Sequence, residues 1–221
     1  MSDESQRAVY ADSTVEVRSD WPTDKGDPPV IEGYAAVFNS LSEDLGGFRE
    51  IIRPGAFDEA LADDALDVSA RVQHDGGLTT IGRTTNGTLR LSTDATGLRY
   101  EVDPPNTQAG RDIVALIRRG DINKSSFAFS LRDNGELWHW ESEPATRELL
   151  NLNLYDVAPV DGPAYQRTTA EVRSNGETLK ETARRAFDEA RERVTPKITK
   201  EDIRREILDD MTEPRYRCDH L

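Results

Sequence analysis

The sequence has very little cysteine and no long apolar run. Its 221 residues include one cysteine, Cys218, which has no second cysteine with which to form an internal disulfide. No apolar stretch approaches the roughly 20 residues that a transmembrane helix needs, and the segment MSDESQRAVYADS lacks the basic start and apolar core of a signal peptide. We therefore expect a protein of a reducing, intracellular compartment with no membrane span.

Basic residues and histidines are also scarce. The chain has 28 Lys and Arg against 42 Asp and Glu, which gives a formal net charge of -14. Proteins that bind nucleic acid neutralise phosphates with Lys and Arg, so this balance argues against a nucleic-acid partner. Cys218 and His220 are two possible metal ligands on a polar tail, which is too few for a site, so we expect no metal and no cofactor. His139 lies between two tryptophans, where packing or a surface position is expected.

The pattern of apolar residues predicts one domain with polar extensions at both ends. Residues 1–29 are expected to form a polar N-terminal segment whose first dozen residues are loose, 30–173 the domain, and 174–221 a charged helical tail. Strands are predicted where β-branched and aromatic residues cluster or alternate. These stretches are TVEVR, VIEGYAAVF, GGFREIIRPGAF, LDVSARVQH, GTLRLSTD, GLRYEVD, FAFSL, ELWHWES and ELLNLNLYDVAPV. The domain is therefore expected to be mostly β.

Helices are predicted at three places. The stretch AFDEALAD favours a short helix, and residues 107–119 have a cap at Asn106 or Thr107, one apolar face and Gly120 at the end. Beyond Arg173, GETLKETARRAFDEARERV carries a thin apolar stripe, and residues 200–211 form a second helical stretch. The stripe consists of Leu179, Ala183, Ala186 and Ala190. This region is either a solvated tail or an arm that docks on a partner.

Three kinds of side chain near strand ends suggest nucleophilic chemistry. His74 ends the strand LDVSARVQH, Ser125 and Ser126 precede FAFSL, and Asp156 lies near the end of the last strand. Each alone is an ordinary turn or loop residue. Together they supply a hydroxyl, an imidazole base and a carboxylate that can orient the imidazole. No GxSxG motif surrounds the serines, which argues against an ordinary α/β-hydrolase.

Seven stretches recur in the order typical of one protein family. They are GYAAVFN, FREIIRPGAF, VQHD, IGRT, GTLRLSTDATGLRYEVD, TQAGRDIVALIRRGDINKSSFAF and LYDVAPVDGPAY. Over about residues 30–165 the chain closely resembles the prohead proteases of tailed phages, which are serine peptidases. The resemblance implies an α+β fold similar to that of herpesvirus assembly proteases, with a mostly antiparallel, β-barrel-like core and flanking helices.

The resemblance also implies roles for particular residues. His74 takes the place of the catalytic histidine and Ser126 that of the nucleophile, while Asp156 stands where the family more often has glutamate. Ser125 competes with Ser126, but neighbours in a strand point to opposite faces, so only one can serve the site. Ser126 matches the family position, with Phe127 and Phe129 on the opposite side facing the core. Backbone amides around residues 161–162 are candidate oxyanion donors.

The function implied is that of a serine endopeptidase in procapsid maturation. It would cut scaffold segments from the major capsid protein, and eventually itself, inside the assembling procapsid in the host cytoplasm. The expected partners are the major capsid protein and its scaffold segment, with a homo-oligomer possible and no nucleic acid or membrane. Two alternatives are a noncatalytic internal scaffold on the same fold and a small-ester hydrolase, which would need a deep apolar pocket. The tail is expected to recruit the enzyme and to be removable by its own cleavage.

Overall fold

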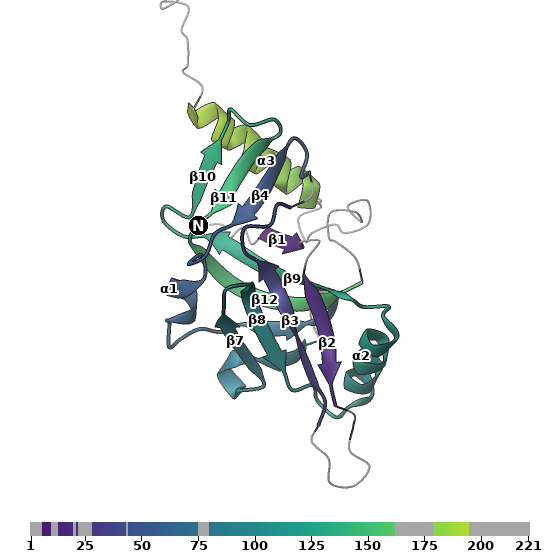
Figure 1. The fold of residues 1–221 in the computed structure, drawn as a ribbon. Coiled ribbons are helices and arrows are strands. Elements are labelled where there is room, and N and C mark those ends of the chain that lie inside the picture. The colour runs from purple at the N-terminus through teal and green to yellow at the C-terminus, as the bar shows by residue number, and fades with distance from the viewer. Residues whose placement is uncertain are drawn as a thin grey trace, which may run out of the picture. The chain divides into compact units, whose positions relative to one another are not determined.

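A computed structural model describes residues 6–9, 13–19, 21, 28–42, 44–74, 80–161 and 179–194. In these residues the chain is mostly β (Figure 1). The strands are β1 Gln6–Val9, β2 Thr14–Arg18, β3 Val30–Val37, β4 Phe48–Ile52, β5 Ser69–Arg71, β6 Thr80–Arg83, β7 Leu89–Thr93, β8 Gly97–Val102, β9 Lys124–Leu131, β10 Glu136–His139, β11 Ala145–Leu149 and β12 Leu152–Val160. The α-helices are α1 Asp58–Leu61, α2 Gln108–Arg119 and α3 Leu179–Val194, and short 3₁₀ turns lie at Val72–His74 (η1) and Thr84–Asn86 (η2). Residues 1–184 and 185–221 form two separate compact units.

The strands form three sheets. Their orders are β1-β9-β12-β5-β6, β10-β11-β4 and β2-β3-β8-β7. Neighbouring strands are antiparallel except in the pairs β12–β5 and β11–β4, which are parallel. Among the described strands no pairing closes a sheet into a barrel. The predicted mostly antiparallel β fold with a few helices is therefore confirmed, whereas the herpesvirus-like barrel stays a prediction.

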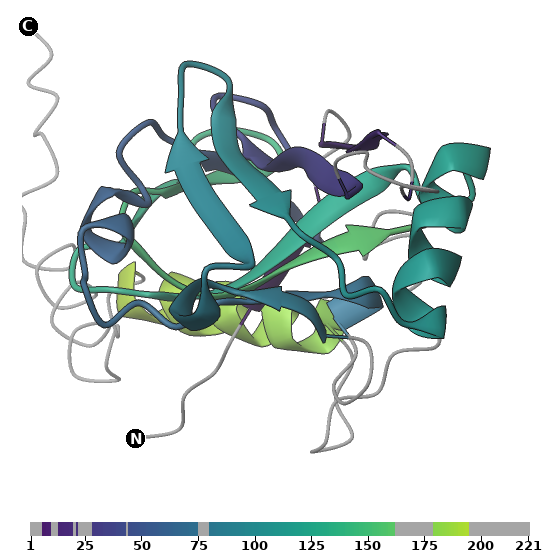
Figure 2. The ribbon, with the colours of Figure 1, turned by 90° about the horizontal axis from the view of Figure 1, so that it is seen from below.

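The apolar core draws on both larger sheets, whose strands cross one another in Figure 2. Aromatic side chains lie at its centre: the ring of Phe127 is 5.2 Å from that of Phe129 and 5.5 Å from that of Phe57. Each fully buried side chain of this size contributes roughly 1.5–3 kcal/mol relative to an exposed one. The expected core-facing side of the strand that carries Phe127 and Phe129 is confirmed, since both side chains belong to the apolar core.

Helix α2 has the boundaries that its sequence indicates. Thr107 caps its start by accepting a hydrogen bond on its side chain from the backbone N–H of Gly110, and Gly120 ends it with a φ of 85°. Ile113 and Ile117 are buried on the predicted apolar face. The helix lies beside β2 (Figure 1). It leads the chain into β9, the strand that carries the two serines.

Four strand predictions need correction. The segment LDVSARVQH is a strand only over β5, because the chain turns at η1. The segment ELLNLNLYDVAPV is two strands, β11 and β12, separated at residues 150–151, because its continuous alternation hides the turn. The strand with the serines begins at Lys124 rather than at Phe127. The sequence also gave no indication of β6, whose four residues are too few for a recognisable pattern.

Two strands lie within the N-terminal residues 1–29. Strand β1, in the part that was expected to be loose, pairs with β9 through its backbone. The predicted strand β2 pairs with β3 and so belongs to the four-stranded sheet. The expectation that the first dozen residues are loose is therefore wrong for Gln6–Val9. The predicted charged helix after Arg173 is present as α3, while residues 200–211 lie outside the described residues.

Candidate active site

Strand β9 sends its two adjacent serines to different partners. The Ser126 hydroxyl oxygen lies 2.5 Å from His74 Nε2. The Ser125 hydroxyl instead donates to the backbone oxygen of Thr14 at 2.7 Å and lies 2.7 Å from the Tyr100 hydroxyl. The alternation of a strand explains the difference, since Ser125 shares the side of Phe127 and Phe129. The structure therefore brings Ser126, and not Ser125, to the histidine.

A β-bulge in β12 brings Asp156 to the same face as Ser126. Leu154 pairs with Phe129, but the next pair is Asp156 with Ala128, so the register shifts at Tyr155. Paired residues on neighbouring strands share a face. Without the extra residue, Asp156 would point to the core side with Leu154; with it, Asp156 lies on the face of Ala128 and Ser126. Bulges commonly re-aim a side chain in this way.

His74 lies at the end of the turn that follows β5. Both Gln73 and His74 have left-handed backbone conformations, with φ values of 57° and 56°. Such conformations cost a non-glycine residue about 1–3 kcal/mol and persist only where the surrounding structure holds them. Here they end the strand and leave the imidazole between two partners, because its Nδ1 lies 2.5 Å from Asp156 Oδ1.

The three side chains form one hydrogen-bonded chain that is almost closed to solvent. Ser126 is 0% exposed, His74 5% and Asp156 4%. An ionised carboxylate only accepts, so Asp156 fixes the proton of a neutral imidazole on Nδ1, and Nε2 is then the acceptor for the Ser126 hydroxyl. Burial strengthens these contacts, since the dielectric constant there is low. The short aspartate reaches the ring because β12 lies directly between β5 and β9.

Ser125 belongs to a second buried network that holds the start of β9. Its hydroxyl links β8, through Tyr100, to the start of β2, and its backbone N–H donates to the hydroxyl of Ser13 at 3.2 Å. Burial raises the pKa of the Tyr100 phenol, which keeps the hydroxyl protonated as a donor. Apart from the paired serines, no pattern in the sequence predicts this network, because Tyr100 has the character of an ordinary strand residue.

The remaining candidates lie elsewhere or outside the described residues. His139 is part of β10, with its Nε2 3.1 Å from Glu148 Oε1, and is partly exposed. No group of three or more His, Cys, Asp or Glu side chains within the described residues has the arrangement of a metal site. Cys218 and His220 lie outside them, as does Gly162, so the oxyanion donors stay a prediction. No helix in the described part of the chain is long and apolar enough to cross a membrane.

Comparisons with known proteins show the family of the chain. The prohead protease of Enterobacteria phage HK97 is 32% identical over 111 residues, which are 49% of this chain and 45% of that protein. The match thus spans less than half the length of that relative. Among solved structures, the capsid assembly protease of bacteriophage T4 has a TM-score of 0.47 and 12% identity, covering 73% of this chain and 100% of that one. A family model described as caudovirus prohead serine protease matches residues 13–184. The match covers most of the chain and confirms the resemblance read from its sequence: the chain belongs to the caudovirus prohead serine protease family.

Proposed function

We propose that the protein is a serine endopeptidase that cleaves scaffold segments of the major capsid protein, and itself, during maturation of a phage procapsid. The observation that carries this proposal is the continuous chain of contacts from Asp156 Oδ1 through the His74 ring to Ser126 Oγ. A serine hydroxyl is a weak nucleophile unless a base takes its proton, and this chain supplies the base and the group that orients it. Membership of the prohead serine protease family supports the reaction class.

In the proposed mechanism Ser126 attacks the carbonyl carbon of the scissile peptide bond. His74 Nε2 takes the hydroxyl proton as the Oγ–C bond forms, and Asp156 stabilises the resulting imidazolium. The imidazolium then gives the proton to the departing amine, which breaks the C–N bond and leaves an acyl-enzyme. Water hydrolyses this ester with His74 again as base. Backbone amides around residues 161–162 are proposed to bind the oxyanion.

The proposed place of action is the assembling procapsid in the host cytoplasm. The partners would be the major capsid protein with its scaffold segment, and a second copy of the chain where the enzyme assembles. The acidic net charge of -14 favours a protein substrate over DNA. The proposal includes the herpesvirus-protease-like arrangement of the β core, which the mostly antiparallel sheets support.

A noncatalytic internal scaffold on the same fold is the alternative function. A scaffold tolerates any separation between the three side chains, whereas catalysis requires hydrogen-bond reach. The distances of 2.5 Å on both sides of His74 favour the enzyme. The strained backbone at Gln73 and His74 points the same way, since such strain is typical of functional sites.

Co-expression with the major capsid protein of the same phage tests the proposal. We expect intact-mass analysis to show shortened capsid protein with the native chain and full-length capsid protein with Ser126→Ala. Ser125→Ala is the matched control, because it removes the same atom from the neighbouring residue on the other face, and it should still cut. If Ser126→Ala still cleaves and Ser125→Ala does not, the assignment of Ser126 as the nucleophile is wrong.

We further propose that the charged tail, residues 174–221, recruits the enzyme to the procapsid and is removed by its own cleavage. Described side chains of α3 include buried Phe187 and Ala190, and its sequence is otherwise rich in charge. A helix with so narrow an apolar stripe gains stability mainly by docking. Truncation after Arg173 should leave thermal unfolding nearly unchanged and yet prevent co-purification with procapsids. An insoluble truncated protein, or one packaged at the native level, would contradict this role.

A further inference from the structure

The strand that carries Ser126 has two edges, and both are paired. One edge of β9 pairs with β12, which contributes Asp156 to the site. The other edge pairs with β1, the outermost strand of the five-stranded sheet. The other side of β12 pairs with β5, and β5 pairs with β6, so β12 is an inner strand of the sheet. Only the β1 side of β9 is therefore a place where another strand could enter.

The register of β1 places it directly beside the proposed nucleophile. Val9 pairs with Ser126, Ala8 with Phe127, Arg7 with Ala128 and Gln6 with Phe129. A peptide that adds to a sheet edge in extended form makes the same main-chain pairing. β1 thus fills the part of the β9 edge that an extended peptide would need in order to lie next to Ser126.

β1 is a short strand, and hydrogen bonds to β9 hold the chain that follows it. It has four residues, and its backbone pairs with β9 alone among the described strands. The chain that follows is fixed close by, since Ser13 and Thr14 both bond to Ser125 at the start of β9. Release of β1 would therefore open the edge without disturbing the network around Ser125, because that network begins at residue 13.

We propose that the edge of β9 along Ser126 to Phe129 is the docking edge for the extended peptide substrate, and that β1 occupies it in the absence of substrate. This inference rests on the proposed function and adds to it the binding mode of the substrate and a self-occluding strand. The burial of Ser126, at 0% exposure, agrees with a closed state that must open before a peptide bond reaches the hydroxyl.

The register also gives a rule for the substrate. The peptide residue opposite Ser126 lies on the face of the site, and its neighbour opposite Phe127 lies on the core face. In β1 the residue at this position is Ala8, so we expect a small side chain at the same position of the substrate.

A binding experiment tests the docking edge without catalysis. The probe is a fluorescein-labelled peptide of residues 4–13, ESQRAVYADS, and the protein is the full chain with Ser126→Ala. In a second variant Gln6 to Val9 are also replaced by Gly-Ser-Gly-Ser, which weakens strand formation and keeps the chain length. We expect the peptide to bind the replaced variant about tenfold more tightly, because the edge is no longer occupied. A scrambled peptide is the control and should not bind.

A disulfide that holds β1 on β9 reversibly provides a third variant. Arg7→Cys and Ala128→Cys are introduced together in a Cys218→Ser background, since paired Cα atoms in an antiparallel sheet lie about 4.5–5.5 Å apart, within disulfide range. The oxidised protein should neither bind the probe nor, with Ser126 restored, cleave capsid protein; a reductant should restore both. Each single cysteine variant should be insensitive to oxidation.

The outcomes separate this inference from the proposed function. Equal probe binding by the variants with native and with replaced Gln6 to Val9 would overturn the role of β1. Probe binding and cleavage that persist in the oxidised double-cysteine variant would do the same, while Ser126-dependent cleavage would still support the proposed function. Absence of Ser126-dependent cleavage in every variant would overturn the proposed function. Probe binding that follows the state of β1 would in that case still establish the peptide-docking edge.

Discussion

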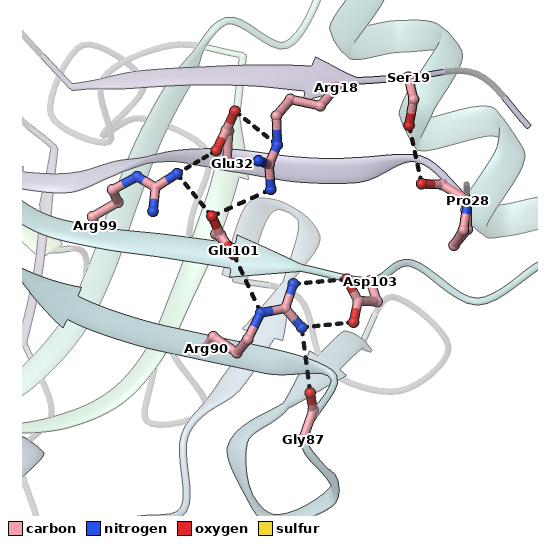
Figure 3. A network of polar contacts seen from close by, with 9 residues as sticks. All are labelled: Arg18, Ser19, Pro28, Glu32, Gly87, Arg90, Arg99, Glu101 and Asp103. Atoms are coloured by element: carbon pink, nitrogen blue, oxygen red, sulfur yellow. Dashed lines mark hydrogen bonds and ion pairs between the residues drawn. The ribbon is translucent and has the colours of Figure 1, made fainter. Parts of the chain in front are cut away.

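Two polar clusters, one on the four-stranded sheet and one on the five-stranded sheet, hold their side chains in different ways. On the four-stranded sheet, arginines and carboxylates form a ladder across the strands (Figure 3). Its members are Arg18, Glu32, Arg90, Arg99, Glu101 and Asp103. Glu32 and Glu101 are paired directly across β3 and β8, which would repel, but Arg18 and Arg99 each bond to both carboxylates. The ladder is partly exposed and carries three charges of each sign.

The cluster of His74, Ser126 and Asp156 is arranged differently. Its side chains are short, buried and joined in a single line, with His74 between the other two. In the ladder, every guanidinium has at least two carboxylate contacts, so the loss of one leaves the others. The difference predicts that the ladder tolerates the loss of one arginine, whereas the line of three does not tolerate the loss of a member.

The largest effect on cleavage is expected from replacing His74, which lies between Asp156 and Ser126. His74→Ala should reduce capsid-protein cleavage about as much as loss of the serine, by roughly 10⁴-fold or more, because members of a triad act as a unit. Asp156→Asn should cost less or differently, since it keeps the imidazole in place but no longer fixes its proton on Nδ1. Cleavage rates from intact mass over time provide the measurement, with unchanged thermal unfolding as the control for folding. Normal activity in His74→Ala would contradict the proposed mechanism.

An ion-pair cluster around Arg147 resembles the ladder in its residue types but is buried, so it tests how burial changes the cost of losing an arginine. Arg147 lies between Glu50 and Glu136, with N–O distances of 2.7 and 2.6 Å, and the side chains of Arg147 and Glu50 are only 2% and 3% exposed. Its guanidinium also lies 5.6 Å from the centre of the Trp138 ring. Removal of one partner of such a pair typically costs about 3–5 kcal/mol, because a charge is left buried without a counter-ion. Arg147→Met should show this loss in urea unfolding at pH 7.

The pH dependence identifies the charge responsible. Burial raises the pKa of the Glu50 carboxyl, an effect that Arg147 opposes. Without Arg147 the folded state binds a proton on Glu50 more readily than the unfolded state, so stability rises as the pH falls below the folded-state pKa. The destabilisation of Arg147→Met should therefore be smaller at pH 5 than at pH 7, and the double variant with Glu50→Gln should recover part of it. A loss that is independent of pH and of Glu50 would show that packing against Trp138 dominates.

The two adjacent serines sharpen the contrast within one strand. Ser125→Ala leaves the Tyr100 hydroxyl without its Ser125 partner and removes the bond to the Thr14 carbonyl, so we expect a loss of about 1–3 kcal/mol in the free energy of unfolding. Ser126→Ala should change stability much less and abolish cleavage. Chemical denaturation and cleavage assays of both variants provide the measurement. Equal effects of the two substitutions on both readouts would remove the distinction between a structural and a reacting serine.

The sequence predicted this division of roles but not the means by which the chain achieves it. Alternation along FAFSL placed Ser126 and the phenylalanines on opposite sides, because a strand has a period of two. Helix α2 was found with its cap and its terminal glycine, since both signals are local. The closeness of His74, Ser126 and Asp156 was inferred from their places near strand ends and from the resemblance, because residues 52 and 82 positions apart carry no local sign of contact.

What the sequence did not reveal depends on pairing between distant strands. The bulge at Tyr155, which brings Asp156 to the correct face, looks like unbroken alternation until β12 is aligned with β9. The left-handed turn at Gln73 could not be predicted, because it contains no glycine, the residue that usually marks such a conformation. β1 has the polar sequence QRAV, which predicts no strand, and it forms one because β9 offers a backbone edge. Such features follow from tertiary contacts rather than from local preference.

The smallest effect is expected in the ladder, because the carboxylate that loses its partner there is exposed to water: the side chain of Asp103 is 42% exposed. Arg90 holds both oxygens of Asp103, at 2.6 and 2.8 Å, and also contacts Glu101, yet Glu101 keeps Arg18 and Arg99 as partners. Exposed ion pairs of this kind contribute about 0–1 kcal/mol, so Arg90→Gln should destabilise the fold by no more than that.

The pH dependence of the same variant tests whether the small effect comes from the ion pair. Hydrogen bonds from Arg90 hold the pKa of the Asp103 carboxyl below its usual range. Its contribution is therefore present above the unfolded-state pKa, about 3.9, and is lost as the pH falls through the folded-state value. Urea unfolding of the native chain and Arg90→Gln should thus differ slightly at pH 7 in low salt and converge in acid and in 1 M salt. A loss as large as that of Arg147→Met would show that exposure to water does not compensate Asp103 for the loss of Arg90.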